Sequence, residues 1–94
     1  MATYLMFGSY SLEAIKAISA ERTEKAAALV EAHGGEVKSG YALLGDNDLV
    51  LIVDLPDIEH AMKVSVALTK MLGIAFSTSP AVPVTAFDRM MEEG

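Results

Sequence analysis

Residues 45–57 read GDNDLVLIVDLPD and contain the signals for a turn, a strand and the start of a helix. The Gly-Asp-Asn-Asp run at 45–48 favours a turn, because Gly and Asn tolerate positive φ and Asp can hydrogen-bond its own backbone. The apolar run that follows predicts a strand over 49–54. Pro56 and then Asp57 begin a helix with a carboxylate N-cap. The segment is therefore the second half of a β-hairpin that leads directly into a helix.

The first half of the chain supplies another strand and helix. Thr3–Tyr10 (TYLMFGSY) is rich in aromatic and large apolar residues, which favour a strand. Ser11 then provides an N-cap, and the helical stretch runs up to Gly34-Gly35, which supplies a left-handed stop. Polar residues interrupt the apolar stripe of this stretch. One long helix is therefore as compatible with the pattern as a short turn followed by a helix from about Ser19.

The remaining elements complete the pattern. Glu36–Leu44 predicts the first strand of the hairpin, and the second helix ends at Gly73, a typical C-cap. Residues 74–84 predict a last strand, and its two prolines restrict it to an edge of the sheet. A short C-terminal helix follows, and its apolar stripe consists of Phe87, Met90 and Met91.

The resulting order β-α-β-β-α-β is that of the ferredoxin-like fold. We therefore predict a single α+β domain over residues 1–94, with a four-stranded antiparallel sheet and a short C-terminal helix. Right-handed crossovers place the first and third strands in the centre of the sheet and the other two at its edges.

Both central strands are apolar on both faces, whereas a sheet with one face in water alternates apolar and polar residues. In the first strand Leu5 and Phe7 point to one face of the sheet, and Tyr4 and Met6 point to the other. A single chain lacks the helices to cover both faces. We therefore expect two copies to pack face to face as a dimeric α/β barrel, in a homodimer or a higher homo-oligomer. In the alternative, the C-terminal stripe folds over the open face.

A resemblance to a known family rests on residues spread over most of the chain. They are Arg22, Gly34-Gly35, Tyr41, Gly45, Asp48-Leu49-Val50 and Leu55-Pro56-Asp57. In these residues the chain resembles the GYD domain family, small bacterial proteins that are grouped with the dimeric α/β barrel proteins and have no established biochemical function. The family is named for a Gly-Tyr-Asp element at the hairpin, and this chain has Asn47 where the family usually has tyrosine. The resemblance implies the barrel fold and transfers no catalytic role.

Composition limits the partners that we expect. Of the 94 residues 52% are hydrophobic, and 13 acidic residues against 7 basic ones give a net charge of -6. This composition argues against intrinsic disorder, and no apolar window reaches the about 18 residues of a membrane span. An acidic chain matches nucleic acid and anionic lipid poorly, so we expect neither as a partner. The first apolar run is too short for the hydrophobic region of a signal peptide, and no basic residue precedes it. The chain also has no cysteine, so we expect a cytoplasmic location.

Two functions are compatible with the pattern. In the first, the chain is a non-catalytic homo-oligomeric module that binds or senses a small metabolite between the two sheets. In the second, it is a cofactor-independent small barrel enzyme, similar to monooxygenases or isomerases, by fold analogy alone. A guanidinium can pair with the carboxylate of a ligand or with an Asp or Glu side chain in a structural ion pair. Hydroxyl groups can orient a small polar ligand, or belong to ordinary sheet packing with their polar ends in water. The candidate ligand-binding residues are Arg22, Tyr41, Tyr4, Tyr10, Ser77 and Ser79.

The hairpin turn supplies the family-motif positions Gly45, Asn47 and Asp48. Asp46 and Asp48 have no third ligand nearby in sequence, and neither histidine has a metal-ligand spacing, so we expect no metal site. The Gly34-Gly35 pair follows a helix instead of preceding one, which is the wrong context for binding phosphate. We therefore expect no cofactor.

Overall fold

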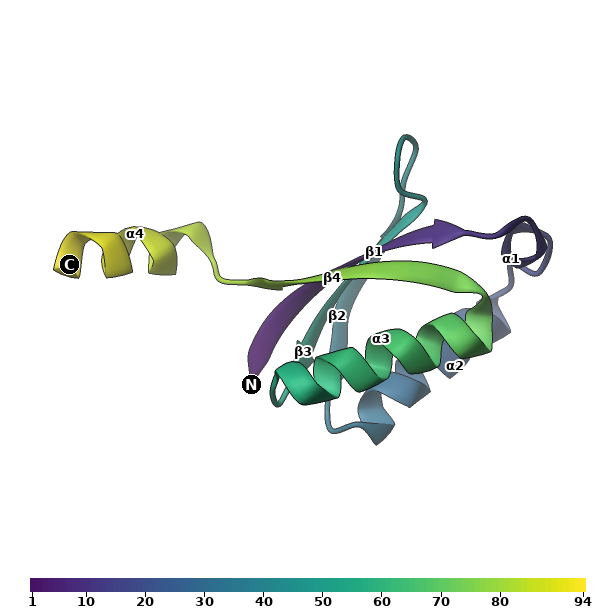
Figure 1. The fold of residues 1–94 in the computed structure, drawn as a ribbon, viewed down its shortest axis with the longest axis horizontal. Helices are drawn as coiled ribbons and strands as arrows, with labels where there is room; N and C mark the ends of the chain where they lie inside the picture. Colours follow the sequence, from purple (N-terminus) through teal and green to yellow (C-terminus); the bar gives the residue numbers. More distant parts are fainter.

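The computed structural model describes all 94 residues and confirms the ferredoxin-like α+β fold with an additional C-terminal helix (Figure 1). The strands form one antiparallel sheet in the order β2-β3-β1-β4, so β1 and β3 are central. The elements along the chain are β1 (Ala2–Tyr10), α1 (Leu12–Lys16), α2 (Ala20–Ala32), β2 (Glu36–Ala42), β3 (Leu49–Leu55), α3 (Ile58–Leu72), β4 (Ile74–Ala81) and α4 (Val84–Glu93).

Local side-chain caps divide the first helical stretch into two helices. The Ser11 hydroxyl accepts a hydrogen bond from the Ala14 N–H, and the Ser19 hydroxyl accepts one from the Arg22 N–H. Two N-caps eight residues apart begin two separate helices, α1 and α2. The interrupted alternative is therefore the one that the chain adopts.

The same kind of signal sets the ends of α3. The Asp57 carboxylate accepts a hydrogen bond from the His60 N–H at 2.9 Å, which begins the helix. Gly73 ends it with φ of 68°, a left-handed conformation that glycine adopts without steric cost. Both termini lie where the sequence predicts them.

The core lies between the sheet and the two long helices, which cover the same face (Figure 1). Met6 and Val53 from the central strands and Leu68 from α3 are fully buried there. Each such side chain contributes about 1.5–3 kcal/mol to the free energy of unfolding. Met71, an apolar residue in the last turn of α3, is exposed.

The opposite face of the sheet carries apolar side chains that no helix of this chain covers. Register places Leu5 beside Ile52 and Phe7 beside Val50 on this open face. The prediction that both faces are apolar is confirmed. Helix α4 does not fold over the open face: it follows β4 and extends away from the rest of the molecule (Figure 1), and none of its residues is buried.

Two strands end earlier than the sequence predicts. Strand β2 ends at Ala42 instead of Leu44, because the chain leaves the sheet there for the turn. Strand β4 ends at Ala81 instead of Val84, because Pro83 starts the next helix. Pro80 lies in β4, which is an edge strand as predicted. None of the helices combines the length and the apolar character that crossing a bilayer requires.

Candidate functional site

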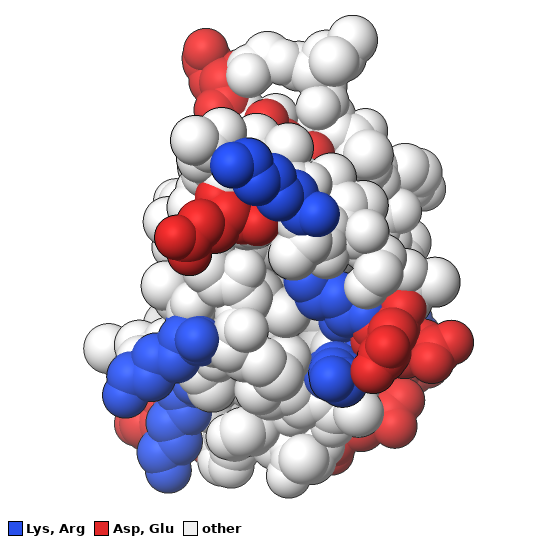
Figure 2. Space-filling model, turned by 90° about the vertical axis from the view of Figure 1, so that its right-hand side faces the viewer, with Lys and Arg blue, Asp and Glu red and all other residues white.

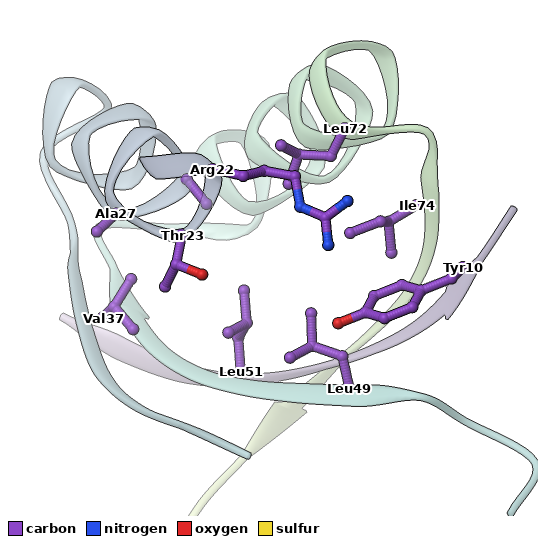
Figure 3. Close-up of a pocket in the computed structure, with 10 residues that line it drawn as sticks. Tyr10, Arg22, Thr23, Ala27, Val37, Leu49, Leu51, Leu72 and Ile74 are labelled. Carbon is purple, nitrogen blue, oxygen red and sulfur yellow. The ribbon is translucent and has the colours of Figure 1, made fainter. Parts of the chain in front are cut away.

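A cavity of about 90 Å³ lies on the helix side of the sheet, at the end where β1 finishes, α2 begins and α3 finishes (Figure 3). Apolar side chains from the sheet and the two helices make up most of its wall. Its lining consists of Tyr10, Arg22, Thr23, Ala26, Ala27, Val37, Leu49, Leu51, Leu72 and Ile74. We call this cavity the Arg22 pocket.

Arg22 is the charged group of the pocket. Its backbone is fixed in the first turn of α2 by the bond from its N–H to the Ser19 hydroxyl, at 3.1 Å. One guanidinium nitrogen donates to the Ala14 carbonyl, and the guanidinium carbon lies 5.4 Å from the centre of the Tyr10 ring. Figure 3 shows the guanidinium between the helices and the Tyr10 ring. Arg22 is half-buried and forms no ion pair with any carboxylate.

Asp48 fixes the position of Tyr10. Its carboxylate accepts a hydrogen bond of 2.9 Å from the Tyr10 N–H, although the two residues are 38 positions apart. Its own N–H donates to the Gly8 carbonyl, and its carbonyl accepts from the Leu43 N–H, both at 2.8 Å. The motif residue Asp48 therefore joins the hairpin to the end of β1 and holds the strand that carries the pocket tyrosine.

Gly8 also helps to position the residues of the pocket, and the sequence alone did not single it out. A Cβ atom at Gly8 would lie 2.9 Å from Cγ2 of Ile74 and 3.0 Å from Cε1 of Phe76. Because real Cβ atoms do not approach carbon this closely, only glycine allows β4 to pack at this position. Ile74 is also part of the pocket wall, so Gly8 helps to set the width of the pocket.

The donor groups and the wall together define what the pocket can bind. A guanidinium has five N–H donors in a rigid fork that matches a carboxylate, and here one nitrogen contacts a backbone carbonyl. The hydroxyl groups of Tyr10 and Thr23 are the other polar groups of the lining. The arrangement fits a small molecule with one anionic group and an apolar body.

The structure separates the six candidate residues into three places. Tyr10 and Arg22 meet at the pocket, and the Tyr4 ring is buried in the core. The others lie on the open face, where Tyr41 pairs with Val50 and Ser77 pairs with Phe7. Ser79 pairs with Leu5, two positions along β4 from Ser77, and therefore lies on the same open face. The six residues therefore do not form one site.

The turn residues and the charged groups near α3 lie outside the pocket. Gly45 has φ of 122°, which explains a glycine at this turn, and Asn47 is partly buried beside it. The structure contains no group of three His, Asp or Glu side chains placed to hold a metal ion. A hydrogen bond from the His60 backbone lowers the pKa of Asp57, helped by the His60 side chain and Lys63. Asp57 begins α3, whereas the pocket residue Leu72 ends it.

The surface at this end of the molecule carries charges of both signs. Figure 2 shows the end where β1, α1 and the last turn of α3 lie, with basic and acidic side chains interspersed over largely uncharged surface. Neither sign forms a continuous patch on this face.

Comparison with known proteins supports the fold and identifies the family. No curated protein sequence matches the chain. Its structure is similar to that of the Mycobacterium tuberculosis leucine response regulatory protein, with a TM-score of 0.58 and 12% identity over 87% of this chain and 51% of that one. An AsnC family transcriptional regulator from Agrobacterium tumefaciens also has a TM-score of 0.58, with 22% identity over 87% of this chain and 50% of that one.

The chain thus spans about half the length of these regulators, and the likeness concerns the fold. The model of one family, the GYD domain, matches residues 4–91, which confirms the resemblance seen in the sequence and shows that the chain belongs to the GYD domain family.

Proposed function

We propose that the protein is a homo-oligomeric module that binds a small apolar carboxylate in the Arg22 pocket and senses it without transforming it. One observation carries this proposal. The Arg22 guanidinium is half-buried at an apolar cavity and has no carboxylate partner in its own chain. A partly desolvated cation gains most from a charge-assisted, bidentate hydrogen bond, and a ligand carboxylate can supply it.

The size of the pocket limits the apolar part of the ligand. An engineered apolar cavity of about 150 Å³ holds benzene, and the Arg22 pocket, which is partly open to solvent, has a volume of about 90 Å³. By proportion it holds about four non-hydrogen atoms. With the carboxylate outside this volume, beside Arg22, the ligand is a straight or branched monocarboxylate of about five carbons.

The lining favours binding over catalysis. General acid–base catalysis is carried out most often by His, Glu or Asp, and the pocket wall contains neither an imidazole nor a carboxylate; Tyr10 and Arg22 are its only ionisable side chains. The candidate residues also do not converge on one cavity as a catalytic site would require, because Arg22 and Tyr41 lie on different faces of the sheet. The fold is shared with proteins named as regulators, which supports a sensing function by analogy.

The open face supports association of two copies. Its centre is apolar, with Leu5, Phe7, Val50 and Ile52, and its border is polar, where the Thr3 hydroxyl donates to Asp54 at 2.8 Å. An apolar centre with a polar rim is typical of protein interfaces. We propose that two sheets pack through this face, with Tyr41, Ser77 and Ser79 around the apolar centre.

Binding is tested by calorimetry and by thermal unfolding at one fixed protein concentration. We expect monocarboxylates of four to six carbons to bind and the matching alcohols and amides to bind far more weakly, because only the acids pair with Arg22. At a ligand concentration about 100 times Kd, the expected stabilisation is about 2.7 kcal/mol.

Three variants assign the effect to the guanidinium. Arg22→Gln should abolish carboxylate binding, and Arg22→Lys should keep part of it, because an ammonium keeps the charge and loses the fork. Arg89→Gln on the exposed helix α4 makes the same change of charge and should bind like the unaltered chain. Equal binding of acids and alcohols, or equal binding by Arg22→Gln, would contradict the proposal.

A further inference from the structure

Helix α4 is a short amphipathic helix without a partner in its own chain. It has ten residues, none of them buried, and the apolar stripe along it consists of Phe87, Met90 and Met91 together with Val84. Isolated helices shorter than about 12–15 residues are marginal in water, and most of their stability in proteins comes from packing of the apolar face. An ordered α4 therefore needs a surface to pack on.

The outer side of α3 offers an apolar surface of matching length. Ile58, Met62 and Val66 follow each other at four-residue spacing and are 51%, 64% and 55% exposed. A groove beside this stripe is lined by α3 residues together with Phe76 and Thr78 of the edge strand β4. A second, shallower groove on the other side includes Lys63 and Lys70. A ridge of side chains between two grooves is the usual receptor for another helix.

The charges beside the two stripes are opposite. On α3, Lys63 and Lys70 line the groove beside Met62 and Val66. On α4, which contains three acidic residues and one arginine, Asp88 and Glu92 are one turn apart and follow the apolar stripe on one side. Docking of one stripe on the other brings these lysines and carboxylates to the same border, where ion pairs select the partner and its orientation.

The path of the chain directs α4 away from its own α3. Strand β4 runs from the C-terminal end of α3 back past its N-terminal end, and α4 continues in the same direction (Figure 1). Only Val82 and Pro83 connect the two elements, and Pro83 is extended, with φ of -59° and ψ of 144°. A reversal onto the same molecule would have to occur within these two residues. We propose that α4 docks on the Ile58–Met62–Val66 stripe of a second copy of this chain.

This contact uses the side of the molecule opposite the open face. It is therefore independent of the proposed sheet pairing and of the Arg22 pocket, and it can be tested without any ligand.

Because the chain has no cysteine, single cysteines report the contact by disulfide formation between separately labelled chains. We expect an equimolar mixture of full-length Met62→Cys and Phe87→Cys chains to give a disulfide-linked heterodimer under mild oxidation, identified by mass spectrometry. Leu12→Cys is the matched control for Met62→Cys, because Leu12 is also strongly exposed, at 70%. The heterodimer yield with Met62→Cys should exceed that with Leu12→Cys at least tenfold.

Three results would overturn the proposal. The first is an equal yield with both partners. The second is an internal disulfide in a Met62→Cys/Phe87→Cys double variant diluted with excess cysteine-free chain, which would place α4 on its own α3. The third is dominant Phe87→Cys self-linkage, which would mean that two α4 helices pair. As a second measurement, Lys63→Glu/Lys70→Glu should lower the Met62–Phe87 cross-link, and Asp88→Lys/Glu92→Lys on the other chain should restore it.

Discussion

The Asp48 carboxylate should stabilise the fold far more than a turn residue normally does. Replacement by alanine removes the acceptor of the Tyr10 N–H and leaves the two backbone hydrogen bonds of residue 48 in place. The perturbation is therefore a single hydrogen bond to a charged group in a partly buried position. Such bonds contribute about 1.5–3 kcal/mol.

The size of the effect follows from the length of the chain. For a domain of roughly this size, each kcal/mol shifts Tm by about 4–8 °C. Asp48→Ala should therefore lower Tm by about 6–24 °C in thermal unfolding followed by circular dichroism. Asp48→Asn retains a carbonyl acceptor and loses the charge, so about half of that decrease is expected.

Asp46→Ala is the matched control, since Asp46 lies two positions away in the same turn, is exposed and makes no side-chain hydrogen bond. It should change Tm by no more than a few degrees. The protein concentration has to be the same in all samples, because association makes Tm depend on concentration. A Tm of Asp48→Ala equal to that of Asp46→Ala would refute the role of Asp48 in holding β1 and Tyr10.

Three further predictions concern other parts of the molecule. Ile52→Lys places a charge in the centre of the open face and should lower the mass measured by light scattering below that of the unaltered chain and of Leu12→Lys, because it removes the sheet contact and leaves the α4 contact in place; a mass equal to that of Leu12→Lys would argue against pairing through this face. Gly8→Ala should cost about 1–3 kcal/mol in urea unfolding, because its Cβ meets the buried Ile74; unchanged stability would show that β4 can move. The pKa of Asp57 is lowered from 3.8 in the folded chain, so its carboxylate stabilises the fold above that pH and the contribution is lost as the pH falls below it. Asp57→Asn should therefore be less stable than the unaltered chain at pH 6, and the difference should narrow as the pH falls below 3.8; a difference that stays constant would contradict this.

The element order was predictable because its signals are local. Ser11, Ser19, Asp57 and Gly73 each bond backbone groups within four residues, so the sequence alone places these helix ends. The apolar character of both sheet faces was also visible, since it depends only on the alternation along each strand.

The site was not predictable because its contacts join distant parts of the chain. In β1, the two sets of alternate residues are similarly apolar. The sequence therefore does not show that Met6 faces the helices and that Phe7 lies on the open face. The bond from Tyr10 to Asp48 and the position of Arg22 over the Tyr10 ring depend on how the hairpin, β1 and α2 meet. Without that geometry, Tyr10 and Tyr41 are equivalent candidates.

The central claim is that the ligand lies at Arg22 on the helix side of the sheet, and a carboxylate titration followed by heteronuclear NMR tests it most directly. With a five-carbon monocarboxylate, we predict saturating chemical-shift changes at the Arg22 side-chain N–H, the Tyr10 ring and the methyl groups of Leu49 and Ile74. The open-face residues Ser77 and Ser79 should not change. Saturating changes at Ser77, Ser79 and Tyr41 with none at Arg22 would place the ligand between the two sheets and contradict the account.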